Sequence, residues 1–163
     1  MNSLSLYRFF SLIIIVYRKM KKHFYLLFFA VSMSLTACGS EQVINVEQLP
    51  APAREVIEAH FANEQISYVM KERDVFSLEY VVKFATGCKV EFDSKGELKK
   101  VDCRMKEVPE ALVPAPIQKY VKDKFPNAII TEFDKSDRHI EVELNNDLVL
   151  EFNSDYEFLR FDD

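Results

Sequence analysis

The feature that most constrains the fold of this chain is a match between two halves of its own sequence. Leu49-Pro50-Ala51-Pro52 recurs as Val113-Pro114-Ala115-Pro116, at an offset of 64 positions. Farther along, residues 90–94 (VEFDS) recur as residues 150–154 (LEFNS), at an offset of 60. A repeated pattern of this length indicates two structural units of one kind, which we place at residues 48–107 and 108–163. The change of offset implies an insertion in the first unit near residues 73–76, where a hairpin loop would tolerate it.

Each unit begins with an amphipathic helix that has proline at its entry, where the fixed backbone angle favours the first turn. The apolar positions have the same spacing in both copies, the i, i+3, i+4, i+8 stripe of a helix lying on a core. They are Ala53, Val56, Ile57 and Phe61 in the first helix, and Ile117, Tyr120, Val121 and Phe125 in the second.

The remainder of each unit reads as β-strands. Apolar and polar residues alternate along residues 80–84 and again along 140–144, which is typical of strands with one buried face. The strands are predicted at 65–71, 76–85, 88–93, 97–103, 128–134, 138–145, 148–153 and 157–162. The predicted fold is therefore α+β: two tandem helix-plus-four-strand repeats, with an antiparallel sheet and the helices packed on one face.

The N-terminal region has the pattern of a lipoprotein leader. Basic residues precede an apolar run of about a dozen residues, which is too short for a spanning helix of roughly 20, and the run ends in Leu35-Thr36-Ala37-Cys38. We interpret residues 1–37 as a signal peptide, Cys38 as a lipidated cysteine and residues 38–47 as a tether. Met20 opens a leader of ordinary form, so residues 1–19 are either an overlong reading frame or an extended basic region. The protein is then expected on the outer membrane, at its periplasmic face or at the cell surface.

Charge excludes one class of partner. Without the five basic residues of segment 1–37, the 21 basic residues of the chain fall to 16 against 26 acidic ones, a formal charge of −10. Such a surface repels nucleic acid, whose binding depends on neutralising phosphates. We expect contact with the membrane through the lipid on Cys38, and a protein of the cell envelope as partner.

Two further cysteines, Cys88 and Cys103, flank a hairpin about Lys95-Gly96. Export places them where disulfides persist, and folding about this turn sets them opposite each other. A bulge at Gly96 would instead shift the register by one residue and separate them onto opposite faces. A Cys88–Cys103 disulfide is the preferred reading, and two free thiols are the alternative.

The Pro-Ala-Pro helix entry, the Phe125-Pro126 helix end and the strand patterns at 140–143 and 150–152 resemble the PepSY-like family, which is also described as β-lactamase-inhibitor-like. The resemblance covers nearly all of residues 46–163. It implies exported proteins with tandem copies of the unit, and it brings no catalytic residues.

No group of residues in the sequence indicates a particular enzymatic reaction. Asp134, Asp137 and His139 superficially resemble metal ligands, but they flank a predicted turn, where polar residues collect for solvation. His60 lies on the apolar stripe of its helix and reads as an edge residue. We therefore expect no enzyme, no cofactor and no metal.

The sheet face left open by the helices is the predicted partner-binding surface. It is expected to carry five apolar residues among charged ones, which suits an interaction module that acts as an inhibitor or accessory factor. These residues are Tyr68, Met70, Val81, Leu98 and Phe158. The competing interpretation is that they complete the core. Alternative functions are a small-ligand or ion sensor and a hydrolase whose site forms only in three dimensions.

Overall fold

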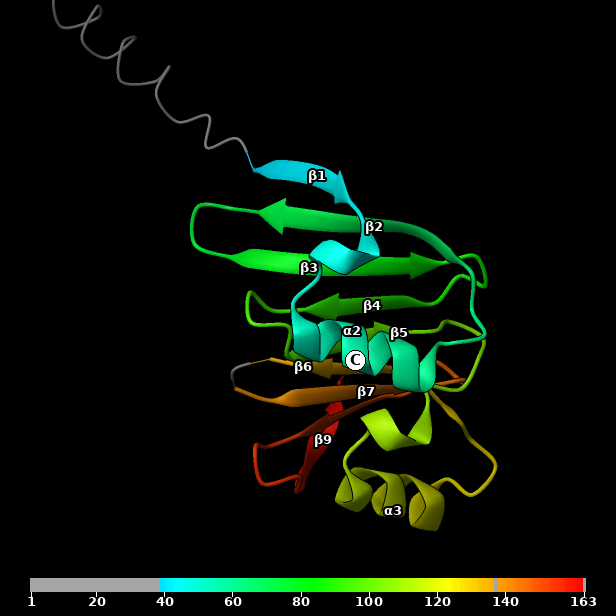
Figure 1. Cartoon of the computed structure of the whole chain (residues 1–163). Coiled ribbons are helices and arrows are strands. Elements are labelled where there is room, and N and C mark those ends of the chain that lie inside the picture. The colour runs from blue at the N-terminus through cyan, green and yellow to red at the C-terminus, as the bar shows by residue number, and fades with distance from the viewer. Residues whose placement is uncertain (1–38, 137, 163) are drawn as a thin grey trace, which may run out of the picture. The chain divides into compact units, whose positions relative to one another are not determined.

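A computed structural model describes residues 39–136 and 138–162 (Figure 1). Within them, two α-helices and two short 3₁₀ helices accompany nine strands. The elements in chain order are β1 (Ser40–Ile44), η1 (Val46–Gln48), α2 (Ala51–His60), β2 (Ile66–Arg73), β3 (Leu78–Phe84), β4 (Lys89–Phe92), β5 (Leu98–Asp102), η2 (Glu110–Leu112), α3 (Ala115–Lys124), β6 (Ile130–Lys135), β7 (Ile140–Leu144), β8 (Val149–Phe152) and β9 (Phe158–Asp162).

All nine strands form a single antiparallel sheet in which each strand pairs with its neighbours in sequence, in the order β1 to β9. Because successive strands run in opposite directions, the connections alternate between the two ends of the sheet. The loops that join β2 to β3, β4 to β5, β6 to β7 and β8 to β9 therefore meet at one end, which we call the hairpin end.

This architecture corrects the predicted fold class. The predicted strands overlap observed ones, but the chain does not form two helix-plus-four-strand repeats. β5 pairs with β6 across the junction between the matching halves, through Lys100 opposite Asp134 and Val101 opposite Phe133. A sheet edge exposes unpaired N–H and C=O groups, so joining the two sets of strands satisfies both edges at the junction. Among residues 39–136 and 138–162, the result is one nine-stranded sheet accompanied by the two α-helices α2 and α3.

The segment 38–47, expected to be a tether, includes β1, a strand that the sequence did not predict. β1 pairs antiparallel with β2, with Val43 opposite Met70 and Ile44 opposite Val69. Ile44 is buried, so this strand contributes to the core as well as covering the edge of β2. Neither α2 nor α3, within the part of the chain that the structure describes, is long and apolar enough to cross a membrane.

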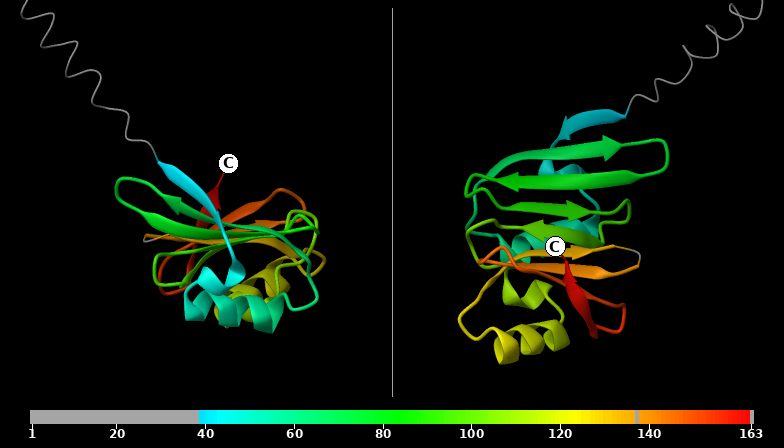
Figure 2. Two further views of the ribbon diagram at one scale, coloured as in Figure 1. Left: turned by 45° about the horizontal axis from the view of Figure 1, so that its top comes forward. Right: turned by 180° about the vertical axis from the view of Figure 1, so that it is seen from behind.

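Both α-helices lie on the same face of the sheet (Figure 2). Proline occupies the entry of each, at Pro50 and Pro114. The predicted stripes face the sheet: Ala53 and Ile57 are buried in α2, and Ile117 and Val121 in α3. Between helices and sheet lie the largest fully buried side chains, among them Phe84, Phe92, Ile117, Leu144, Leu150 and Phe152. Each side chain of this size contributes roughly 1.5–3 kcal/mol on burial.

The Cys88–Cys103 disulfide is confirmed. The hairpin of β4 and β5 does contain an irregularity, between Glu91 and Phe92, where Phe92 pairs with Leu98 and Glu91 with Lys100. Lys99 is therefore the extra residue, and it restores the register in which Lys89 opposes Asp102. The two cysteines, one position beyond that pair, consequently meet. The bulge that could have separated them lies in β5 rather than at Gly96, and it brings them together.

Candidate functional site

The open face of the sheet carries one row of side chains that crosses all nine strands. Residues directly opposite in neighbouring strands share a face, so the pairings define the row unambiguously. In order from β1 to β9 it contains Val43, Met70, Val81, Glu91, Lys100, Asp134, Glu141, Glu151 and Arg160. The row is apolar on its first three strands and charged on the other six.

The apolar end of this row forms a small surface cluster, which we call the apolar patch: Val43, Tyr68, Met70 and Val81. Val43 is 71% exposed and Tyr68 is 41% exposed. Met70 is half-buried, and Val81 is covered by its neighbours at 6% exposure. A parallel row of Glu41, Glu72 and Glu79 runs alongside the patch toward the hairpin end.

Three of the five predicted partner-binding residues, Tyr68, Met70 and Val81, thus lie together on the open face. Leu98 and Phe158 do not, because both pack against the core. Phe158 stacks on Tyr120 of α3 with ring centroids 4.9 Å apart. The bulges explain the difference, since the extra residue at position 99, and its counterpart at 159, reverses the faces assigned to the residue before it.

Val43, the most exposed member of the patch, was missed by the sequence reasoning because it falls in the segment assigned to a tether. The available signal was the β-branched pair Val43-Ile44, which favours a strand but is too short to specify one.

The middle of the open face is organised by Lys100. Its ammonium donates hydrogen bonds to the carboxylates of Glu132 and Asp134 in the neighbouring strand. Burial lowers the pKa of Lys100, but the bonds to these two carboxylates outweigh it and leave the pKa raised. Lys99 likewise donates to Glu79 at 2.6 Å, and Lys89 pairs with Glu91 at 2.7 Å.

Acidic residues outnumber basic ones over the rest of this face, and the pKa values of two of them are raised. Burial raises the pKa of Glu72, and the carboxylates of Glu41, Glu91 and Glu79 raise it further. Burial also raises the pKa of Glu143, with added repulsion from Glu132, Asp147 and Asp102. The open face is therefore an acidic surface that favours a positively charged partner.

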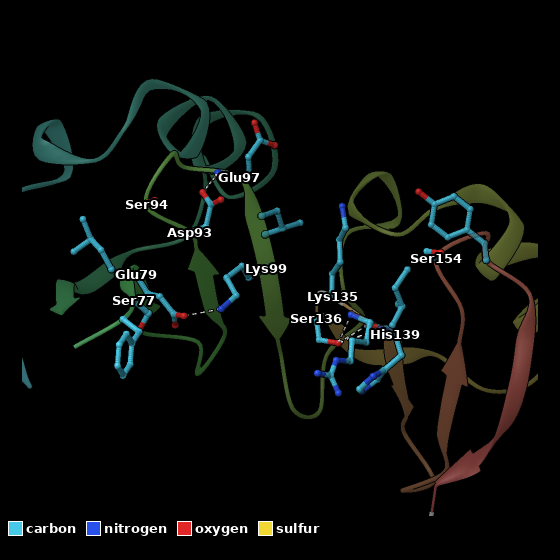
Figure 3. A pocket seen from close by; sticks show the side chains of 16 residues that line it. Ser77, Glu79, Asp93, Ser94, Glu97, Lys99, Lys135, Ser136, His139 and Ser154 are labelled. Carbon is cyan, nitrogen blue, oxygen red and sulfur yellow. Dashed lines mark hydrogen bonds and ion pairs between the residues drawn. The ribbon is translucent and has the colours of Figure 1, made fainter. Parts of the chain in front are cut away.

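A second feature is a groove of about 680 Å³ at the hairpin end, lined by all four loops there (Figure 3). Glu79 and Lys99, joined by their ion pair, lie on one side, and Lys135 and His139 on the other. Two of the loops have matching turns, in which the side chains of Asp93 and Asn153 each accept two backbone N–H bonds.

Tyr156, which lines this groove, has a φ of +66°, a backbone conformation that is uncommon for residues other than glycine. Its counterpart at the offset of 60 is Gly96, at φ +88°. A Cβ on Gly96 would lie 2.7 Å from the Cβ of Pro50 at the start of α2. Glycine is therefore required sterically in the first turn, whereas the second turn presents an aromatic ring to the groove.

The other candidate groups gain little support from the geometry. His139 contacts the carboxylate of Glu141 at 2.7 Å, which accounts for its imidazole without a metal. Across residues 39–136 and 138–162, no three His, Cys, Asp or Glu side chains are grouped closely enough to hold a metal ion. Cys38, the predicted lipidation site, and Asp137 lie outside the described residues.

Comparisons with known proteins agree with this fold. The profile of the beta-lactamase-inhibitor-like, PepSY-like family matches residues 78–160. None of the curated proteins matches the chain. A crystal structure of a Bacteroides thetaiotaomicron protein, whose description proposes a periplasmic, calcium-regulated protein, is 35% identical with a TM-score of 0.73, covering 76% of this chain and 97% of that one.

Two crystal structures from Bacteroides vulgatus, both described as periplasmic, are also similar. One is 33% identical with a TM-score of 0.74, over 76% of this chain and 98% of its own. The other is 34% identical with a TM-score of 0.72, over 76% of this chain and 100% of its own. These relatives support an extracytoplasmic location. The predicted resemblance is confirmed, and the chain belongs to the PepSY-like family.

Proposed function

We propose that this protein is an extracytoplasmic interaction module, anchored to the outer membrane by lipid on Cys38, that binds a protein of the cell envelope. The observation that carries the proposal is the apolar patch on the sheet face opposite to the one that α2 and α3 cover. Val43 and Tyr68 are exposed there beside a row of three glutamates. In this proposal the protein acts by binding, as an inhibitor or accessory factor, and not as an enzyme.

The chemistry of the face defines the partner. An aromatic ring beside apolar side chains, here Tyr68 next to Met70 and Val81, is a typical centre for a protein interface, and charged residues form its rim. Because carboxylates predominate around the patch, the complementary surface should combine an apolar side chain with lysine or arginine. The acidic rim would accelerate association with such a surface and select against acidic proteins.

A second candidate function is a small-ligand sensor that uses the groove at the hairpin end. The supporting observation is its size, about 680 Å³, which lies in the range of ligand pockets. The description of one relative proposes calcium regulation. The described part of this chain contains no group of three ligating side chains, so an organic ligand suits the groove better than a bare ion.

The test is partner capture from the native envelope by chemical crosslinking and mass spectrometry, comparing the wild type with Tyr68→Ala. Truncating an exposed tyrosine should change folding stability little, whereas loss of a central interface aromatic can cost 2 kcal/mol or more in binding, about a thirtyfold weakening. We therefore expect captured partner to fall sharply at unchanged thermal stability.

Two controls make the result specific. Phe76→Ala removes a ring that is 98% exposed but lies at the groove, away from the apolar patch, and should leave capture unchanged. Phe158→Ala should instead lower stability by about 2–3 kcal/mol, because its ring packs against the core. Equal capture by wild type and Tyr68→Ala would remove the open face as the binding site, and loss of capture with Phe76→Ala would favour the groove.

A further inference from the structure

Strand β9 presents an edge that its counterpart in the first half of the sequence does not. β5 (LKKVD) corresponds to β9 (FLRFD) at the offset of 60, and β5 pairs with β4 on one side and β6 on the other. Among the described residues, β9 pairs with β8 alone. The sheet thus ends in a strand whose sequence equivalent occupies the middle of the same sheet.

The β5–β6 junction shows which groups of β9 point outward. The N–H of Cys103 donates to the carbonyl oxygen of Thr131 at 2.9 Å, one residue past the last pair of β5 and β6. Main-chain direction alternates along a strand, so Val101 also points its N–H and C=O toward β6. Phe161 corresponds to Val101 and has the equivalent pairing with β8. Its main-chain N–H and C=O therefore point to the outer edge of β9.

The side chains of β9 do little to prevent another strand from joining. Natural edge strands are usually protected by charged side chains, proline, a β-bulge or a covering loop. β9 has a bulge at Leu159, but residues 160–162 pair regularly with β8. The strand contains three apolar residues, of which Leu159 is 52% exposed and Phe161 is 47% exposed. Phe161 lies on the helix side of the sheet and contacts Phe125 edge-on, with ring centroids 6.4 Å apart.

We propose that the β9 edge binds β9 of a second copy of this chain, antiparallel and centred on Phe161. This register places Phe161 opposite Phe161 of the other copy, as a pair that exchanges both main-chain hydrogen bonds. It also places Arg160 opposite Asp162 of the other copy, and Asp162 opposite Arg160. Two equivalent ion pairs, each between an arginine of one copy and an aspartate of the other, thus form from one self-complementary strand. Self-complementarity is the condition for a closed two-fold dimer.

The arginine is suited to this role. Its Nε donates to the buried carboxylate of Glu151 in β8 at 2.6 Å, while the side chain remains 68% exposed. The guanidinium carries four more N–H donors that can reach a carboxylate across the edge. At the β5–β6 junction the equivalent Lys100 does the same, by bonding two carboxylates of the next strand.

The dimer would have a functional consequence for any partner of the open face. It extends the sheet through β9, so that the two open faces join and the two apolar patches lie at opposite outer ends. A partner that is itself repeated or membrane-bound would then be held at two points, which increases the avidity without a new contact.

The test uses two charge variants of the full chain, Arg160→Glu and Asp162→Arg, each purified in detergent and examined by native mass spectrometry. Each variant alone places like charges opposite each other at both ion pairs, so we expect its dimer to weaken at least about tenfold relative to wild type. A mixture of the two restores opposite charges at both positions. The mixture should therefore form heterodimers, identified by their mass, at close to the wild-type affinity.

A second measurement locates the contact. Phe161→Cys should form an intermolecular disulfide in the cell envelope, because opposing residues in such a pair have Cα atoms about 5.5 Å apart, within disulfide range. Val43→Cys, which is more exposed than Phe161 but lies on the edge strand β1, is the control and should stay uncrosslinked. A monomeric wild type, a mixture without heterodimers, or crosslinking at Val43 in place of Phe161 would overturn the proposal.

Discussion

The ammonium of Lys100 in β5 lies 3.0 Å from the carboxylate of Asp134 in β6, and this pair ties the two matching halves of the sequence into one sheet. The lysine also bonds Glu132 and is surrounded by strands on both sides. The carboxylates of β6 and β7 lie opposite each other, Glu132 with Glu143 and Asp134 with Glu141, and without Lys100 they would lose its compensating positive charge.

Replacing this lysine should therefore destabilise the whole sheet. We expect Lys100→Met to lower the free energy of unfolding by about 1–2 kcal/mol, because charge-assisted bonds to a half-buried group are lost and the carboxylates repel one another. Urea denaturation at neutral pH measures the change. The control is Lys122→Met, which removes a fully exposed ion pair with Glu110 and should have no measurable effect. Equal stability of Lys100→Met and wild type would show that main-chain pairing alone holds the junction.

The disulfide should stabilise the first half of the sheet. Cys88 and Cys103 are 15 residues apart in sequence, and a loop of that size contributes about 3 kcal/mol in the chain-entropy model. The double variant Cys88→Ala, Cys103→Ala should lose about this amount in chemical denaturation. Wild type treated with a reductant should match it, and a reductant should leave the double variant unchanged. Two thiols open to alkylation in the protein recovered from the envelope would contradict the assignment.

The raised pKa of Glu143 predicts a specific pH dependence. A carboxyl whose folded-state pKa lies above its usual value of 4.5 destabilises the fold at pH values above the folded-state pKa. The penalty fades as the pH falls through that pKa toward 4.5, where the folded protein takes up the proton. Glu143→Gln should thus raise the free energy of unfolding at pH 7, and with it the melting temperature. The gain should be roughly a few tenths of a kcal/mol, because the group is largely solvated, and it should disappear near pH 4.

Glu55→Gln, on the exposed side of α2, is the control for this comparison and should leave the melting temperature unchanged at both pH values. An advantage of Glu143→Gln that grows on acidification would have the wrong sign for the repulsion described and would refute it.

The lipid anchor can be tested at Cys38. Cys38→Ala should accumulate as a precursor that incorporates no labelled fatty acid, because the thiol is the proposed attachment site. The variant should then be missing from the outer-membrane fraction, because it lacks the lipid and its acidic surface has no attraction for anionic lipid. Normal labelling of the variant would rule out this residue, and Cys88→Ala, which leaves Cys38 intact, should label as the wild type does.

The sequence by itself determined the local elements and the family. Stripes such as Ala53-Ile57 and Ile117-Val121 have one compatible structure, because spacing along a helix decides which side chains share a face. Alternation at Val82-Phe84 and Val142-Leu144 likewise located strands, and the positions of Cys88 and Cys103 about one turn located a disulfide.

Tertiary structure alone decided how those strands combine. The pairing of Lys100 with Asp134 joins residues 34 positions apart, and β1 became a strand by covering the edge of β2. A single extra residue in β5 and in β9 moved Leu98 and Phe158 from the open face to the core. Side chains alternate with a period of two, so one inserted residue reverses every face assignment beyond it, and only the paired neighbour shows where that residue lies.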